Sequence, residues 1–139
     1  MNNEDKELLL KDLCARLPYG VKLHIPSFSD TPQLLQQISD YETIEINDYA
    51  SPIDVDKVKS YLRPMSSMTE EERYEIQGIL GKDIEIIDDF INIIDSSRKR
   101  FSFLELQAVF DWLNAHHFDY IGLIKRGLAL EAQKDMYKN

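Results

Sequence analysis

A capping box near residue 102 begins the segment that most constrains the fold of this chain. Ser102 and Glu105 have the spacing at which each side chain accepts a hydrogen bond from the other's backbone N–H, and Phe101 and Leu106 suit the accompanying hydrophobic staple. Apolar side chains then recur at steps of three and four residues. The pattern predicts a helix from 103 to about 116 with one face in the core, formed by Leu106, Val109, Phe110 and Leu113.

The end of this helix carries the one grouping of side chains that resembles an active or metal site: Asp111, Asn114, His116, His117, Asp119 and Tyr120. Neighbouring residues of a helix point about 100° apart, so His116 and His117 face one ion only if the helix has already ended. Imidazoles at this position more commonly bond the free carbonyls of a helix end. We expect a break between 114 and 120, then a short helix at 120–126 that Asp119 caps and Gly127 ends.

Motifs for catalysis are weak. Cys14 lies among leucines at helical spacing and is expected to be a small buried residue, no GxSxG motif occurs, and the five glycines form no phosphate-binding loop. No HExxH motif or second cluster with metal-ligand spacing is present. The sequence therefore assigns no catalytic residue, metal or cofactor and favours a protein that is not an enzyme. A metal-binding or hydrolytic enzyme using His116, His117 and Asp119 stays as an alternative.

The first half of the chain reads as a helix and strands. Residues 4–17 have a helical stripe of Leu9, Leu10, Leu13, Cys14 and Leu17 that must end at Pro18. Residues 21–25 alternate as a strand does, and 33–38 and 42–47 are spaced as a hairpin. Ser51 is expected to cap a helix that includes Val55, Val58 and Leu62.

A second capping box, Thr69 with Glu72, predicts a helix that ends at Gly81. Residues 83–95 are ambiguous, because their apolar spacing fits a helix while their β-branched side chains fit strands. We favour one or two strands added to the sheet. The expected fold is a single α+β domain over residues 1–139, in which a small antiparallel sheet is covered on one face by two main helices.

The chain is acidic, with a formal net charge of −9 and an isoelectric point near 4.7. Direct binding to nucleic acid is unfavourable because it depends on basic side chains that displace counterions from phosphates. Between residues 69 and 95 there are nine acidic side chains and two basic ones. We expect a protein partner with a basic surface to bind there, at Glu70, Glu71, Glu72, Glu75, Asp88 and Asp89. The acidity also permits an alternative, a mimic of nucleic acid.

The expected location is the cytoplasm. One cysteine cannot form an internal disulfide, and the acidic N-terminal segment has neither the charge nor the apolar length of a secretory signal or a membrane span. We therefore expect no association with membranes. The sequence leaves the oligomeric state open.

Four phrases resemble a recurrent family of short proteins from gut bacteria and their mobile or phage-derived elements: KELLLKDLCARLPYGVK (6–22), VKSYLRPMSSMTEEE (58–72), WLNAHHFDYIGLI (112–124) and GLALEA (127–132). Relatives often carry Arg at the position of Ile121 and Pro at that of Gln133, and the loss of that arginine weakens any case for anion binding in this loop. The resemblance implies one domain whose members differ at 77–102, and it implies no activity or cofactor. The hypothesis for function is therefore a small acidic interaction or regulatory module of mobile-element or phage origin.

Overall fold

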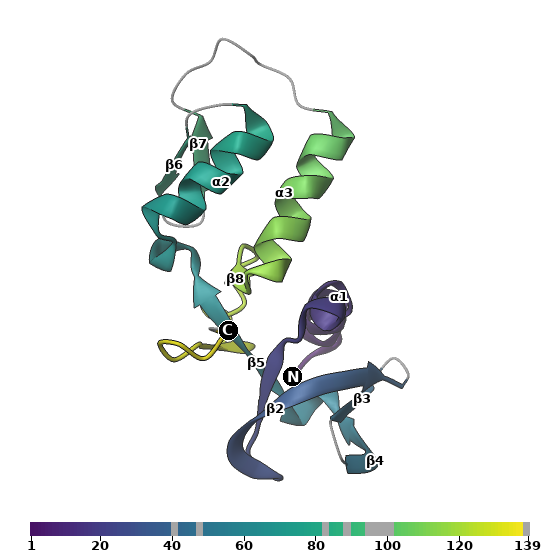
Figure 1. Ribbon diagram of the computed structural model, residues 1–139. Helices are drawn as coiled ribbons and strands as arrows, with labels where there is room; N and C mark the ends of the chain where they lie inside the picture. The colour runs from purple at the N-terminus through teal and green to yellow at the C-terminus, as the bar shows by residue number, and fades with distance from the viewer. Residues whose placement is uncertain (40–41, 47–48, 82–83, 88–89, 94–101, 138–139) are drawn as a thin grey trace. The chain divides into compact units, whose positions relative to one another are not determined.

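The computed structural model describes residues 1–39, 42–46, 49–81, 84–87, 90–93 and 102–137 (Figure 1). The α-helices of these ranges are α1 (Asn3–Arg16), α2 (Glu70–Leu80) and α3 (Phe103–Ala115). The strands are β1 (Lys22–Ile25), β2 (Ser29–Ile38), β3 (Thr43–Ile46), β4 (Tyr49–Asp54), β5 (Lys59–Pro64), β6 (Ile84–Ile87), β7 (Phe90–Ile93), β8 (Phe118–Asp119) and β9 (Ala129–Glu131). Short 3-10 helices occupy Leu17–Tyr19, Val55–Lys57 and Met65–Ser67.

The main sheet is mixed and has seven strands, so the prediction of a small antiparallel sheet with two main helices is wrong. Its order is β4-β3-β2-β1-β5-β8, and β9 also pairs with β5. The strands from β4 to β5 run antiparallel to their neighbours, but β8 and β9 both run parallel to β5. Strands as short as β8 and β9 leave too few residues for an alternating pattern to show in the sequence.

The chain divides into two compact units. Unit 1 comprises residues 1–62 and 123–139, and unit 2 comprises residues 63–122. Each unit has its own cluster of buried apolar side chains. The strand β5 runs continuously across the boundary, pairing through Ser60, Tyr61 and Leu62 in unit 1 and through Arg63 and Pro64 in unit 2. That both units belong to one folding domain stays a prediction.

In unit 1 the helix α1 packs against the sheet, as the sequence predicts. Leu9 and Leu13 are completely buried in a cluster with Leu23 and other strand residues. The rest of the buried face differs from the prediction, because Asp12 and Arg16 are buried there while Cys14 is exposed. Residues 9, 12, 13 and 16 form one stripe at steps of three and four, and the two charged side chains can enter it because they pair with each other.

The predicted helix at 51–62 is wrong. These residues form β4, a 3-10 turn and β5 instead. Pro52 is tolerated because β4 is the first strand in the order of the sheet and needs to donate on one side only. In β5 the consecutive residues Ser60, Tyr61 and Leu62 are all buried, as expected of a strand with neighbours on both sides. Such burial on both faces removes the alternation that distinguishes a strand from a helix.

Unit 2 is built from α2 and α3, which lie side by side (Figure 1). Both predicted capping boxes are present, Thr69 with Glu72 and Ser102 with Glu105, and Gly81 ends α2 at a φ of 65°. Ile76 and Leu80 of α2 share a buried cluster with Val109 and Leu113 of α3. Phe101, the other half of the predicted staple, lies outside the described residues.

The ambiguous segment contains strands. β6 and β7 form an antiparallel hairpin with Ile84 opposite Ile93. The hairpin is a separate two-stranded sheet, so the prediction that these strands join the main sheet is wrong. Its strand β6 contacts both α2 and the 3-10 helix Met65–Ser67. Residues 83, 88, 89, 94 and 95 of the predicted segment lie outside the described residues.

The predicted helix at 120–126 is replaced by a series of turns. Asp119 therefore caps no helix, although its Oδ1 accepts the N–H of Gly122 at 2.9 Å and stabilises the turn. Gly122 adopts a φ of 90°, which is incompatible with a right-handed helix and readily reached only by glycine. Gly127, at a φ of 77°, ends the turns as predicted and leads into β9.

Candidate functional site

The two adjacent histidines form the end of α3. The Nδ1 atom of His116 lies 2.9 Å from the carbonyl oxygen of Trp112, and the two rings stack with centroids 3.9 Å apart. His117 is buried and has a φ of 64°, so the backbone reverses there and leads into β8. The His116 imidazole thus does contact a carbonyl of the last helical turn, but that carbonyl is not free, because it also accepts the backbone N–H of His116.

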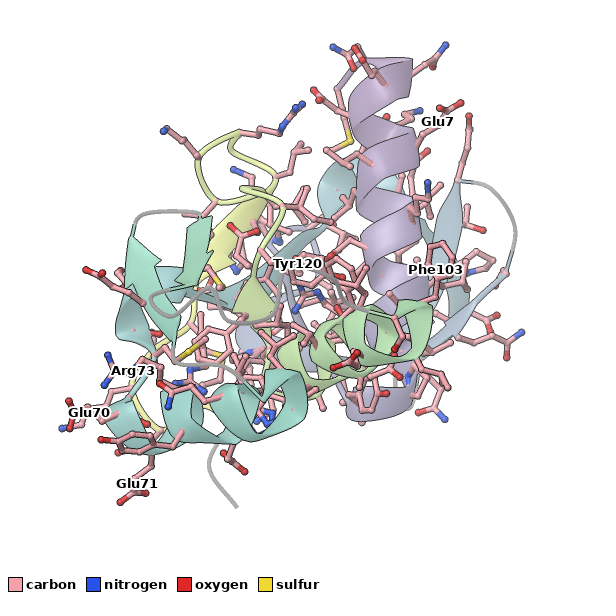
Figure 2. All side chains as sticks on the ribbon, turned by 90° about the horizontal axis from the view of Figure 1, so that it is seen from above. Glu7, Glu70, Glu71, Arg73, Phe103 and Tyr120 are labelled. Atoms are coloured by element: carbon pink, nitrogen blue, oxygen red, sulfur yellow. The ribbon has the colours of Figure 1, made fainter. Side chains whose placement is uncertain are left out.

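The other predicted site residues have separate roles. Tyr120, labelled in Figure 2, donates its hydroxyl hydrogen to Oδ1 of buried Asn114 at 3.0 Å, and its ring lies 5.3 Å from that of Phe110. The Asp119 carboxylate accepts the N–H of Gly122 and so stabilises the turn that follows β8. Exposed Asp111 accepts a hydrogen bond from Gln107 at 2.8 Å. Among the described residues, no group of three or more His, Cys, Asp or Glu side chains is arranged to hold a metal ion.

Arg63 is the residue that organises this region, and the sequence analysis missed it. Its backbone N–H donates to the carbonyl of His117 at 2.7 Å, and its guanidinium stacks on Phe118 at 4.1 Å from the ring centroid. The same guanidinium donates two hydrogen bonds of 2.7 Å to the carboxylate oxygens of Glu72. A lone arginine before Pro64, nine residues from its partner, gives no sequence signal of this arrangement.

Glu72 therefore serves the fold. Its carboxylate accepts the N–H and hydroxyl hydrogen of Thr69 as well as both hydrogens from Arg63. Burial alone would raise the pKa of this carboxyl, but the hydrogen bonds from Arg63 and Thr69 hold its pKa below the usual range. A carboxylate satisfied in this way has little capacity left for a partner.

The remaining acids of α2 are available at the surface. Glu70, Glu71 and Glu75 are exposed, and Glu70 lies 3.5 Å from Arg73 in a long surface ion pair. Figure 2 shows Glu70 and Glu71 projecting outward from the beginning of α2. Asp88 and Asp89 of the predicted partner surface lie outside the described residues.

An exposed apolar face runs along α3. Phe103, Leu106 and Phe110 follow one another at i, i+3 and i+7, and their exposed fractions are 91%, 40% and 45%. Leu104 at the edge of this face is 82% exposed. The prediction that Leu106 and Phe110 belong to the core is therefore wrong. The buried side of α3 is the one carrying Val109 and Leu113.

The sequence did hold a hint of this surface. Apolar residues at 103, 104, 106, 109, 110 and 113 span more of the helix circumference than packing on one neighbour can bury. The four residues Phe103, Leu104, Leu106 and Phe110 are called the α3 apolar face below.

None of the helices in the described ranges is long and apolar enough to cross a bilayer. Comparison with models of protein families, with curated proteins and with solved structures finds no match. The resemblance to proteins of gut bacteria and their mobile elements thus stays a prediction. The case for function rests on the geometry of the chain.

Proposed function

We propose that this chain is a protein-interaction module and that the α3 apolar face is its docking surface. The observation that carries the proposal is the exposure of two phenylalanines and two leucines on one capped helix, with Phe103 and Leu104 almost entirely in solvent. Contiguous exposed apolar surface is costly to solubility and commonly marks a site of association. Large aromatic anchors at the centre of such sites supply much of the binding energy.

The spacing of the face favours one mode of binding. Anchors at i, i+3 and i+7 are those with which an amphipathic helix enters an apolar groove. Phe103, Leu106 and Phe110 have this spacing on a helix whose start is stabilised by its capping box. We therefore propose that the partner presents an apolar groove to α3.

The net charge of residues 63–122 indicates which kind of partner would bind. Residues 63–122 contain twelve acidic and six basic side chains, so the segment that includes α3 is strongly negative. Figure 2 shows Phe103 well separated from Glu70 and Glu71, so these acids attract a partner at long range while the apolar face makes the contact. Such attraction raises association rates and weakens with added salt. The proposed partner is therefore a basic protein.

We place this activity in the cytoplasm and among the accessory or host-directed proteins of mobile or phage-derived elements. The support for this setting is the resemblance of the four sequence phrases. This setting also indicates where to search for a partner, because a host protein or the product of a neighbouring gene is the natural candidate.

The experiment is affinity capture followed by binding measurements with the purified partner. The double variant Phe103→Ser/Phe110→Ser should lose binding by at least tenfold, because it removes both aromatic anchors. The matched control is Tyr74→Ser, which removes an exposed aromatic side chain from α2 instead. Circular dichroism of each variant checks that the fold is intact.

The second part of the experiment reverses the charge of acidic side chains on α2. Glu71→Lys/Glu75→Lys should slow association several-fold and reduce its dependence on salt. A partner indifferent to both the α3 and the α2 variants would refute the proposal. A partner that DNA displaces in competition would instead favour the alternative of a nucleic-acid mimic.

A further inference from the structure

The sheet of unit 1 has a second face that differs from the one under α1. In β1, Leu23 and Ile25 are buried with α1, while Lys22 and His24 point to the opposite side. His24 is directly opposite Lys59 of β5, so these two side chains project from the same face. Tyr61, two residues beyond Lys59, lies on this face too.

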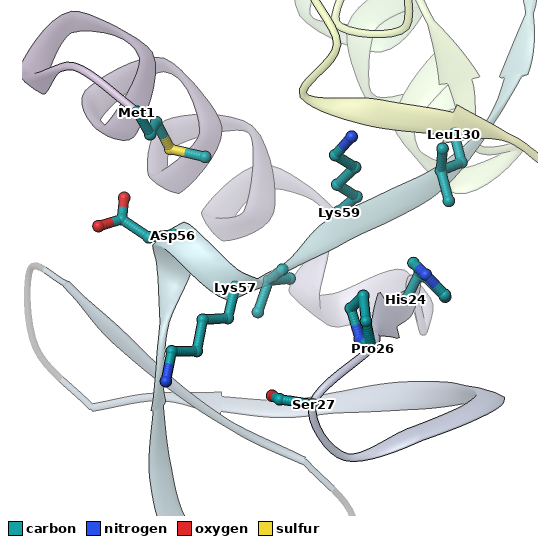
Figure 3. A pocket seen from close by; sticks show the side chains of 9 residues that line it. Met1, His24, Pro26, Ser27, Asp56, Lys57, Lys59 and Leu130 are labelled. Carbon is teal, nitrogen blue, oxygen red and sulfur yellow. The ribbon is translucent and has the colours of Figure 1, made fainter.

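The C-terminal segment covers one end of this face. The hydroxyl of Tyr137 accepts the N–H of Lys22 and donates to the carbonyl of Tyr61, and the Lys22 ammonium donates to the carbonyl of Met136. Next to this covered end lies a cavity of about 490 Å³, which His24 and Lys59 line (Figure 3). Its volume is within the range of sites for small molecules.

Hydrogen-bond donors form part of the lining of the cavity. The Nδ1 atom of His24 lies 3.2 Å from the hydroxyl of Tyr61, and the two rings meet edge to face. When Tyr61 donates to Nδ1, the proton of the neutral imidazole is on Nε2, which becomes a donor. The ammonium groups of Lys57 and Lys59 and the hydroxyl of Ser27 add further donors to the lining.

The charge of the lining is positive in a strongly acidic chain. Asp56 is the carboxylate that lines the cavity, and its Oδ2 lies 3.1 Å from the ammonium of Lys6 on α1. Lys57 and Lys59 form no ion pair with any residue that the structure describes. Figure 3 shows the two side chains extending in opposite directions, so Lys59, which shares a face of the sheet with His24, is the ammonium placed to bind an anion beside that ring.

The other part of the lining is apolar. It is formed by Met1, Pro26, Val58 and Leu130. An inorganic anion would leave this surface unused, whereas an apolar group attached to the anion would bury it. Burial of apolar area contributes roughly 25 cal/mol per Å².

We infer that this cavity binds a small organic anion, a carboxylate or phosphate monoester with an apolar body. The anionic group is held by Lys59 and His24, and the apolar body lies against Pro26, Val58 and Leu130. This binding site belongs to unit 1 and is independent of the docking surface proposed on α3. Carboxylates and phosphate monoesters would be bound by the same positive groups, so the test uses one probe of each class to distinguish them.

The test uses the full chain labelled with ¹⁵N and titrated with phenyl phosphate and with benzoate. Binding should shift the amide signals of residues around His24, Ser27 and Lys59. Benzyl alcohol, which lacks the charge, and inorganic phosphate, which lacks the apolar body, should each bind at least tenfold more weakly than the better anion. The tighter of the two anions identifies phosphate monoester or carboxylate as the natural class.

The variant Lys59→Gln should weaken binding of that anion by roughly fivefold or more, as expected for loss of a charge-assisted hydrogen bond, whereas Lys57→Gln should have a smaller effect because its ammonium points away from His24. The matched control is Lys11→Gln, an exposed lysine of α1 that changes the net charge equally and does not line the cavity. Equal binding of phenyl phosphate and benzyl alcohol, equal effects of Lys11→Gln and Lys59→Gln, or unchanged signals at millimolar probe would each overturn the inference.

Discussion

The Nε atom of Arg16 lies 2.8 Å from Oδ2 of Asp12, one turn earlier in α1, and both side chains are completely buried. Removal of either side chain would take this ion pair away from the other charge, which is buried. We expect Arg16→Met or Asp12→Leu alone to lower the free energy of unfolding by about 3–5 kcal/mol. Urea denaturation followed by circular dichroism measures this loss.

The double variant Asp12→Leu/Arg16→Met is the control for this pair. Because it removes both charges and fills the space with apolar atoms, it should recover most of the stability that each single variant loses. A double variant as unstable as the singles would show that α1 depends on contacts of these side chains other than their mutual ion pair.

The Asp12–Arg16 pair also shows which features of α1 could not be predicted from the sequence. The period of the helix and its end before Pro18 were predictable, because leucines at steps of three and four and a proline are local signals. The membership of the buried stripe was not, since hydrophobicity places Cys14 inside and Asp12 and Arg16 outside. Burial of a charged pair depends on the geometry of the two groups, which a residue type does not encode.

Loss of the Arg63–Glu72 contact should depend on pH. The pKa of Glu72 in the folded chain is below its ordinary value, so its carboxylate stabilises the fold fully above that ordinary value, near 4.5. This contribution falls as the pH drops through the lower pKa of the folded state. We expect Glu72→Gln to cost about 2 kcal/mol at pH 7. The difference from the unaltered chain should shrink as the pH falls below 4.5.

Glu70→Gln is the matched control for this measurement. Glu70 is also in the first turn of α2, but its carboxylate is mostly exposed and 3.5 Å from Arg73. Its loss should change the free energy of unfolding by less than about 1 kcal/mol. Equal pH profiles for the two variants would contradict the role given to Arg63.

The capping box of α3 should be worth a measurable part of the stability. The Ser102 hydroxyl accepts the N–H of Glu105 at 3.1 Å, and the Glu105 carboxylate accepts the N–H of Ser102 at 3.0 Å. We expect Ser102→Ala to lower the free energy of unfolding by about 1 kcal/mol. Ser66→Ala, at an exposed serine outside any helix cap, should change it by less than about 0.5 kcal/mol.

Both capping boxes were predictable because a cap is set by residues three positions apart. The parallel strands β8 and β9 were not, because they pair with residues of β5 more than fifty positions away. The same difference between local and long-range signals applies to the candidate site. The position of the break at His116 was predicted from local pattern, whereas the contact of Arg63 with Glu72 and Phe118 joins three separate elements.

A single folding domain predicts one unfolding transition for both units. Leu13 in unit 1 and Leu113 in unit 2 are both buried, so truncation of either to alanine should cost about 2–5 kcal/mol. If β5 couples the units, each variant should shift the whole calorimetric transition to lower temperature. Two separate transitions, each sensitive to one of the variants, would contradict the prediction.

The hydroxyl of Tyr137 should stabilise the fold of unit 1. Its hydroxyl accepts the N–H of Lys22 at 2.8 Å and donates to the carbonyl of Tyr61 at 2.7 Å, so one side chain near the C-terminus joins β1 to β5. Substitution Tyr137→Phe leaves both backbone groups without this partner. We expect a loss of about 1–3 kcal/mol in the free energy of unfolding, whereas Tyr74→Phe at an exposed tyrosine should be nearly neutral.

Alkaline pH tests the same contact without a substitution. Burial raises the pKa of Tyr137 above its ordinary value near 10, so the neutral phenol stabilises the fold fully below pH 10. That contribution is lost as the pH rises above 10, since the unfolded chain then releases the proton more readily than the folded one. Absorbance near 295 nm should therefore show a tyrosine signal that appears only on unfolding and that Tyr137→Phe removes. Ionisation of all seven tyrosines before the fold is lost would disprove this assignment.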